Sequence, residues 1–132
     1  MSKFGFTGTQ VGMTKHQKVV FQNTLFSLAT KGDEFHHGDC IGADEDAHKI
    51  AILIGLHIHI HPPSMFHKRA NCQANVKYSP RPYLKRNHDI VDSTDLLIAT
   101  PKSKREELRS GTWATIRYAQ KKHKQVIIIY PE

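Results

Sequence analysis

Short apolar runs alternate with segments of helical periodicity along the whole 132-residue chain. The apolar runs have the length of buried strands and predict strands over 3–7, 34–38, 56–61, 96–99 and 125–130. Helical spacing predicts helices over 14–31, 43–55, 83–92 and 112–123. Strands that alternate with helices build a parallel sheet that is covered on both faces. The pattern therefore predicts an α/β fold of three layers, formed by one domain over residues 1–132.

The order of the predicted strands follows from the handedness of their connections. Right-handed crossovers between five strands give the order 3-2-1-4-5 in a mostly parallel sheet, which is a Rossmann-like three-layer sandwich. Ligands of such sheets bind outside the carboxyl ends of the strands, at the switch point between the first and fourth strands. We therefore expect the functional residues in the turns that follow these strands.

Two of the predicted helices carry an apolar face that can pack on the sheet. The face of the first helix comprises Val19, Val20, Leu25, Phe26 and Leu28, and that of the second comprises Ala47, Ile50, Ala51 and Ile54. The segment 62–82, rich in prolines, asparagines and basic residues, predicts a long loop. Long loops in compact domains are often functional, and a lid over the pocket is one role for this one, which the sequence leaves open.

The composition narrows the class of partner. A net charge of +7 with ten histidines favours anionic partners, although the basic residues are spread over several segments, as on a solvated surface. No segment reaches the ~20 apolar residues of a membrane span, so no membrane partner is expected. The two cysteines have no metal-ligand spacing and are typical of reduced thiols in a cytoplasmic protein.

The segment that follows the second predicted strand carries the strongest functional signal. It contains a tight turn at Gly38-Asp39 and a glycine, Gly42, directly before the helix that starts at Ala43. Backbone N–H groups at a helix N-terminus favour a phosphate or a carboxylate. The side chains of Asp39 and Asp44 can hold a sugar hydroxyl or a base beside them. The segment therefore indicates a nucleotide-like ligand.

Two further glycine-bearing turns are expected at the same edge of the sheet. The sequence Gly8-Thr9-Gln10 follows the first strand, and Ser110-Gly111-Thr112 precedes the last helix. Gly111 lets a phosphate approach the backbone, and the two hydroxyls beside it can donate to phosphate oxygens. Alternatively, Ser110 or Thr112 only caps the helix. Trp113 then either stacks on a base or packs in the core.

These motifs, in this order, resemble those of the SLOG superfamily of Rossmann-like nucleotide-binding proteins. That group includes DNA-processing protein A, the LOG phosphoribohydrolases and the YspA-like proteins. The motifs that match are Gly38-Asp39-Cys40-Ile41-Gly42-Ala43-Asp44 with Ala47-His48, then Arg86-Asn87, and then Ser110-Gly111-Thr112. The resemblance extends from about Phe4 to Pro131 and so covers almost the whole chain.

The resemblance implies a pocket for a nucleotide or a nucleotide-derived small molecule. The phosphate would lie on the turn 110–112, with Arg86 as its charge partner and Asn87 beside it. The sugar or base would lie near residues 8–10 and 39–44. Proteins of this superfamily often pair through helices, so a homo-oligomer is expected. No resident cofactor is expected.

One position departs from the pattern of the LOG enzymes. They carry a glutamate three residues after their Gly-Thr, where this chain has Thr115, and a hydroxyl cannot replace that carboxylate in the cleavage of an N-glycosidic bond. We therefore favour sensing or sequestration of a nucleotide-derived signal over its conversion. The second hypothesis is an N-glycosidase whose carboxylate comes from Asp39, Asp44, Glu106 or Glu107.

A third hypothesis is binding of single-stranded nucleic acid. Aromatic rings that stack on bases, interleaved with cationic side chains, are typical of such surfaces. The candidate residues are Tyr78, Arg81, Tyr83, Lys85 and Arg86.

The histidines raise the question of a metal centre. His57, His59 and His61 alternate along a predicted strand and therefore point to one face. They form either a metal-ligand array or the polar outer face of an edge strand, and we expect the latter and predict no metal. His48, one turn into its helix, is expected to orient the turn before it through a hydrogen bond.

Overall fold

The computed structural model describes residues 1–132. Strands and helices alternate along the chain, as predicted. The elements are β1 (Lys3–Gly8), α1 (Lys15–Leu28), β2 (Glu34–His37), α2 (Ala43–Ile54), β3 (His57–Ile60), a 3-10 turn (Phe66–Lys68), β4 (Val76–Lys77), α3 (Tyr83–Asp92), β5 (Leu96–Thr100), α4 (Gly111–Lys121) and β6 (Gln125–Ile128). No helix combines the length and the hydrophobicity that are needed to cross a membrane.

The six strands form one parallel sheet in the order β4-β3-β2-β1-β5-β6. The predicted α/β Rossmann-like class and the order of the five predicted strands are confirmed. The predicted count of five strands is wrong, because Val76 and Lys77 pair with β3 and extend the sheet by one edge strand. A strand of two residues is too short to show an alternation of apolar and polar positions in the sequence. This strand forms only because segment 62–82 folds back along β3.

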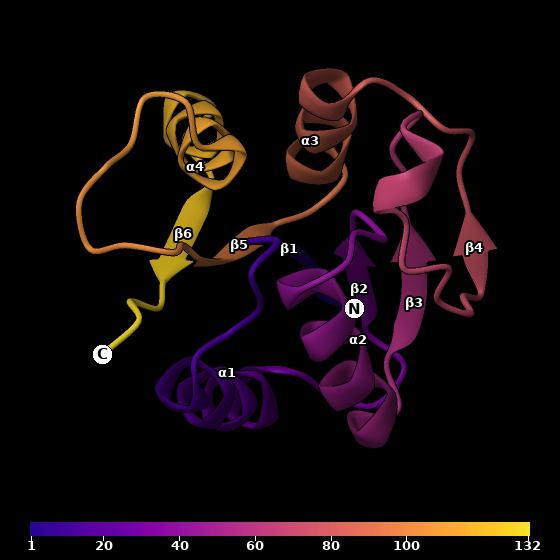
Figure 1. Ribbon diagram of the computed structural model, residues 1–132. Coiled ribbons are helices and arrows are strands. Elements are labelled where there is room, and N and C mark those ends of the chain that lie inside the picture. Colours follow the sequence, from indigo (N-terminus) through magenta and orange to yellow (C-terminus); the bar gives the residue numbers. More distant parts are fainter.

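Helices cover the two faces of the sheet in pairs. Figure 1 shows α1 and α2 on one face, with α3 and α4 on the other. Buried residues of α1 and α2 join those of the central strands in the main hydrophobic cluster. Val91 of α3 and Ala119 of α4 pack together with Leu97 of β5 on the opposite face. The connections place the ends of β1, β2 and β5 and the start of α4 at one edge of the sheet.

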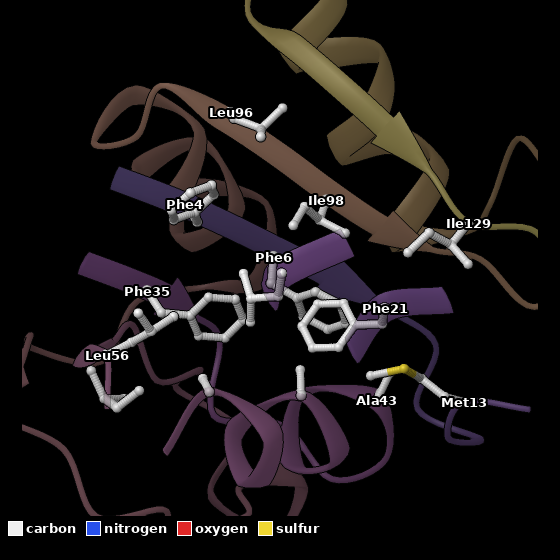
Figure 2. Packing of buried hydrophobic residues seen from close by; sticks show 14 of the residues in the cluster. Phe4, Phe6, Met13, Phe21, Phe35, Ala43, Leu56, Leu96, Ile98 and Ile129 are labelled. Atoms are coloured by element: carbon white, nitrogen blue, oxygen red, sulfur yellow. The ribbon is translucent and has the colours of Figure 1, made fainter. Parts of the chain in front are cut away.

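Three phenylalanines form the centre of the larger core (Figure 2). The rings of Phe6 and Phe21 meet edge to face with centroids 5.3 Å apart, and those of Phe21 and Phe35 do so at 6.1 Å. Edge-to-face pairs add to the stabilisation that burial of their area already provides. They therefore hold α1 firmly against β1 and β2.

The predicted apolar face of α1 is largely wrong. Val19, Phe26 and Leu28 are about half exposed, whereas the buried positions are Gln17, Phe21 and Leu25. The cause is Gln17, whose amide donates to the carbonyl oxygens of Pro101 and Ile129 and so occupies a core position with a polar side chain. The helix start is as predicted, because Thr14 caps it and forms a capping box with Gln17.

The apolar face of α2 is confirmed. Ala47 and Ala51 are fully buried, and Ile50 and Ile54 pack against the same cluster. The helix ends at Gly55, which adopts the left-handed conformation typical of a helix C-cap.

Segment 62–82 does not form a lid. It runs along β3, contributes β4, and makes isolated bridges between Arg69 and Cys40 and between Pro63 and Arg81. None of its residues lines the main cavity described below. The edge position predicted for the strand with His57, His59 and His61 is wrong, since β4 takes the edge.

Candidate ligand pocket at the carboxyl ends of the strands

A cavity of about 350 Å³ lies where β1 and β2 end and α4 begins. Its volume is within the range of small-molecule sites. The three predicted turns all contribute to it, through Gly8, Thr9 and Gln10, through Gly38 and Asp44, and through Ser110, Gly111 and Thr112. Arg86 and Asn87 of α3 complete the set of predicted residues that line it. Segments that lie about 100 residues apart in the chain therefore meet at one site.

The carboxylate of Asp44 braces the turn after β2. Its Oδ2 accepts hydrogen bonds from the N–H groups of Gly38 and Cys40, each at 3.1 Å. Burial raises the pKa of Asp44 to about 6, against an ordinary value of 3.8. A buried carboxyl of this kind changes charge close to physiological pH.

Asp39 does not face the cavity. Its side chain is fully buried on the other side of the turn, where it accepts from the N–H of Cys72 at 2.8 Å and from Nε of Arg69 at 3.3 Å. Asp39 has a positive φ of 54°, so the turn directs its side chain away from that of Asp44. Asp39 therefore does not line the cavity, and its contact with a ligand stays a prediction.

Gly42 and Ala43 also lie outside the cavity lining. A β-carbon on Gly42 would overlap the backbone of Gln10, and the N–H of Ala43 donates to the carbonyl of Thr9 at 2.9 Å. These two residues join the two turns to each other. Because Asp44, Glu45 and Asp46 already place carboxylates in the first turn of α2, the start of this helix does not favour a further anion.

Arg86 is buried beside the cavity without an ion pair. It is only 4% exposed, and its guanidinium donates to the carbonyl oxygens of Gly38 and His61 and to the side-chain oxygen of Asn87. None of the salt bridges in the structure includes it. Its hydrogen bonds are therefore satisfied by neutral acceptors, and its charge is met by the Asp44 carboxylate only through space, without an ion pair.

The start of α4 is the end of the cavity that favours an anion. The hydroxyl of Ser110 accepts from the N–H of Trp113 at 3.2 Å. Ser110 is therefore the N-cap of α4, which was the alternative to a role in phosphate binding. The N–H groups of Gly111 and Thr112 have no acceptor in the chain, and the first turn has no acidic residue. A β-carbon on Gly111 would meet no atom within 4 Å. Both residues line the cavity, so free backbone donors lie at its border.

Trp113 and Thr115 do not reach this space. Trp113 is buried against Ala99 and Ile116, which is the core position that was the alternative to stacking on a base. Thr115 is also buried, and its hydroxyl donates to the carbonyl of Gly111 at 2.8 Å. Residue 115 therefore points into the protein and away from the cavity lining.

Several lining residues were not among the predicted ligand contacts. Lys102 and Arg109 come from the loop before α4, and Tyr83 from the start of α3, where its hydroxyl oxygen accepts from the Gln10 amide at 2.6 Å. Cys40 and Glu107 also line the cavity. The charge of the 102–109 loop is visible in the sequence, but its direction toward the pocket is a property of the fold.

Two buried histidines, His37 and His48, support the turn that follows β2. Nδ1 of His37 accepts from the N–H of Asp39 at 2.9 Å, so the neutral ring carries its proton on Nε2 and donates it to Nδ1 of His48 at 3.0 Å. Burial lowers the pKa of His37 well below its ordinary value, which keeps the ring neutral. The prediction that His48 orients the turn is confirmed, with His37 as the link between them.

Only some of the residues proposed for nucleic-acid binding are accessible. Arg86 is buried under the Tyr83 ring, Arg81 pairs with Asp89 at 2.7 Å, and the Tyr78 ring stacks on His61 with centroids 4.3 Å apart. Tyr78 and Lys85 are exposed, and binding of single-stranded nucleic acid stays a prediction.

Comparison with known proteins supports the fold. No protein-family model matches this sequence, and no curated protein matches it either. Among solved structures, the molybdenum cofactor binding protein from the phototrophic bacterium Rippkaea orientalis is similar with a TM-score of 0.74 and 20% identity, over 99% of this chain and 77% of that protein. The structural genomics target TM1055 is similar with a TM-score of 0.70 and 16% identity, over 96% of this chain and 72% of that one.

A third similar structure is DNA processing protein A from Helicobacter pylori, solved to explain its single-stranded DNA binding mode. Its TM-score is 0.68 at 21% identity, and the match covers 96% of this chain but 64% of that protein. At identities of 16 to 21% these similarities establish a shared fold. The chain thus shares the Rossmann-like fold of these three proteins.

Proposed function

We propose that this protein binds a nucleotide or a nucleotide-derived small molecule in the cavity and acts by sensing or sequestering it. The observation that carries the proposal is the buried guanidinium of Arg86, which borders the cavity and forms no salt bridge, so that the nearby carboxylate of Asp44 offsets its charge only from beyond 4 Å. A buried charge that is not paired at close range is unfavourable. An anionic ligand beside Arg86 would supply a close counter-charge.

The phosphate of this ligand is assigned to the start of α4. The free N–H groups of Gly111 and Thr112 and the partial positive charge of the helix N-terminus favour an anion there. Lys102 and Arg109 line the same end and add two further positive charges. The opposite wall, with Gln10 and Asp44, offers an amide and a carboxylate that suit the hydroxyls of a sugar or the edge of a base.

An N-glycosidase is the second candidate function. Of the four carboxylates considered for this reaction, Asp39 contacts Arg69 and Glu106 pairs with Arg117, whereas Asp44 and Glu107 line the cavity. A group with a pKa of about 6, as Asp44 has, is suited to proton transfer near neutral pH. This observation favours Asp44 as the general acid or base if the bound molecule is cleaved.

We further propose that the chain works as one domain and as a homo-oligomer in the cytoplasm. Large apolar side chains are exposed on the outer faces of α1 and α2, including Phe26 and Leu53. Exposed apolar groups on neighbouring elements are typical of interaction surfaces. Both cysteines are free, as is usual in a reducing compartment.

The experiment that tests ligand binding is native mass spectrometry of freshly purified protein. We expect an additional mass, which denaturation releases as a phosphorylated nucleoside derivative. A thermal-shift panel of nucleoside mono-, di- and cyclic phosphates then ranks ligand classes on protein stripped of bound molecules. If nothing co-purifies and no member of the panel raises the unfolding temperature, the proposal fails. Release of a free base during incubation with the ligand would support the enzyme instead.

A further inference from the structure

A second cluster of polar side chains lies on β2 and β3, away from the cavity. On these strands Phe35, Ile58 and Ile60 belong to the main hydrophobic cluster, so the alternate residues point to the opposite face. Register places His36 beside His59, and Glu34 lies two residues before His36 on the same face. None of the three lines the ligand cavity.

The potential ligand atoms of Glu34, His36 and His59 converge. Nε2 of His36 lies 2.8 Å from Oε1 of Glu34, and Nε2 of His59 lies 3.6 Å from the same oxygen. The three ligand atoms all lie within 4.8 Å of one another. Zinc bound at about 2.0–2.1 Å in a tetrahedral site separates its ligand atoms by roughly 3.4 Å. Small side-chain rotations are therefore sufficient to place an ion between them.

The other ring nitrogens are held by groups that suit a metal site. Nδ1 of His36 lies 2.8 Å from Nε2 of His61, and Nδ1 of His59 lies 3.0 Å from the Tyr78 hydroxyl. When Nδ1 donates to these acceptors, the lone pair of Nε2 points toward Glu34. Such outer hydrogen bonds orient metal-binding imidazoles and select their tautomer.

Ring stacking fixes the planes of these side chains. The rings of His36 and His59 stack with centroids 4.3 Å apart, and the Tyr78 ring stacks on His61 at the same distance. The ligand atoms are therefore held in place before an ion arrives, which lowers the cost of binding it.

The cluster is also accessible to an ion from solvent. The Glu34 side chain is 20% exposed and gives an ion access from solvent.

The group of His37, His48 and Cys72 has similar spacing but an unsuitable tautomer. The N–H of Asp39 donates to Nδ1 of His37, so the proton of the neutral ring must sit on Nε2, the atom that would have to bind the metal. Binding there would break the hydrogen bond that supports the turn. This contrast singles out the cluster on β2 and β3.

We propose that Oε1 of Glu34, Nε2 of His36 and Nε2 of His59 form a binding site for a divalent transition-metal ion of the zinc class. Imidazole and carboxylate ligands suit Zn²⁺ and its neighbours in the first transition row. The fourth position is open to water or to the exposed His57, whose Nδ1 lies 2.9 Å from Nε2 of His59. The site is separate from the ligand cavity and does not depend on the proposed function.

The test uses the full chain, stripped with a chelator and titrated with Zn²⁺ by calorimetry and with Co²⁺ by visible absorption. We expect one ion per chain, and with Co²⁺ the absorption bands of a four- or five-coordinate site. Glu34→Gln and His59→Gln should each weaken binding by more than about 100-fold, and Tyr78→Phe, which removes only an orienting hydroxyl, by about tenfold. Cys72→Ser is the matched control and should bind like the wild type.

Circular dichroism confirms that each variant is folded, and Zn²⁺ should raise the unfolding temperature of the wild type but not of Glu34→Gln. Because Glu34 is partly exposed, Glu34→Gln should fold, and this variant tests the metal site if His59→Gln does not fold. The proposal is overturned if the wild type binds no ion at millimolar concentration. It is equally overturned if Cys72→Ser abolishes binding while Glu34→Gln leaves it unchanged, because the ion then belongs to the other cluster.

Discussion

Arg86 and Gly38 contact each other directly at the edge of the cavity. The guanidinium donates to the carbonyl oxygen of Gly38, and a β-carbon on residue 38 would overlap Nη1 of Arg86. The glycine motif after β2 and the arginine of α3 thus form one unit. The need for glycine at this position is explained by the approach of a side chain from a distant segment.

Gly38→Ala is expected to disrupt this unit. The new methyl group overlaps the guanidinium and also approaches Oδ2 of Asp44, so the turn has to move. We expect the free energy of unfolding to fall by about 1–3 kcal/mol, as is typical of overpacking, and nucleotide affinity to fall with it. Urea unfolding and calorimetric titration with the nucleotide that gives the largest thermal shift measure the two effects.

Gly111→Ala is the matched variant at the other end of the cavity. A β-carbon there meets open space, and alanine favours the helix, so stability should be unchanged or higher by up to about 1 kcal/mol. The methyl group would nevertheless occupy space assigned to the phosphate, and we expect weaker nucleotide binding. A variant that bound the nucleotide as tightly as the wild type would contradict the assignment of the phosphate to α4.

The double variant Lys102→Ala/Arg109→Ala tests the charges of the cavity. Both residues are exposed, so we expect a normal fold and about a tenfold loss of affinity, roughly 1.4 kcal/mol, for a nucleoside monophosphate. Affinity for the corresponding nucleoside should stay the same. Lys104→Ala/Arg105→Ala removes the same charge from the same loop outside the cavity lining, and an equal loss in this control would point to long-range charge alone.

Asp44 is expected to give the protein a measurable pH dependence. Its pKa is raised from 3.8 to about 6 by burial, while the Arg86 guanidinium, the Cys40 thiol and the Asp39 carboxylate are its ionisable neighbours. Between pH 4 and 6 the folded protein holds a proton that the unfolded chain has released, so the contribution of Asp44 to stability falls as pH rises. The full change is up to about 3 kcal/mol.

The comparison of wild type with Asp44→Asn isolates this effect. Urea unfolding of both proteins is measured from pH 4 to 7. As pH rises, the unfolding free energy of the wild type should fall relative to that of the variant. Contributions of the buried histidines are common to both proteins and cancel. A difference that did not vary with pH would show that Asp44 titrates normally in the folded protein.

Thr115→Glu is expected to destabilise the protein and to create no glycosidase activity. The side chain of Thr115 is buried and lies outside the cavity lining, so a glutamate there would be desolvated without lining the cavity. We expect a loss of more than about 2 kcal/mol in unfolding free energy. Thr115→Val, which loses only the hydrogen bond to Gly111, should cost about 1 kcal/mol. Release of a free base by the glutamate variant would show that the side chain at position 115 reaches the ligand, contrary to its buried orientation.

Exchange of exposed apolar residues tests the proposed homo-oligomer. Phe26 is 57% and Leu53 80% exposed, so Phe26→Glu/Leu53→Glu should leave the fold of a single chain intact. If α1 and α2 form the interface, light scattering after size exclusion should show the wild type as an oligomer and the variant as a monomer. A monomeric wild type at about 100 μM would refute the proposal, since a useful dimer binds more tightly than that.

The alternation of apolar and polar residues was sufficient to predict most of the secondary structure. The helix over 83–92 is found as predicted, and the order of five strands follows from right-handed connections alone. Glycines at strand ends indicated which turns meet at one edge of the sheet. These features depend on residues close together in the sequence, or on rules that hold for every parallel sheet.

The direction of individual side chains was decided by tertiary structure. Asp39 and Asp44 look equivalent in the sequence, yet a positive φ turns Asp39 toward Arg69 while Asp44 braces the cavity turn. Gln17 occupies a core position because carbonyl groups of Pro101 and Ile129, more than 80 residues away, satisfy its amide. His59 meets Glu34 only because β2 and β3 pair in this register. Burial of a polar group requires partners from distant segments, and only the folded chain brings those partners together.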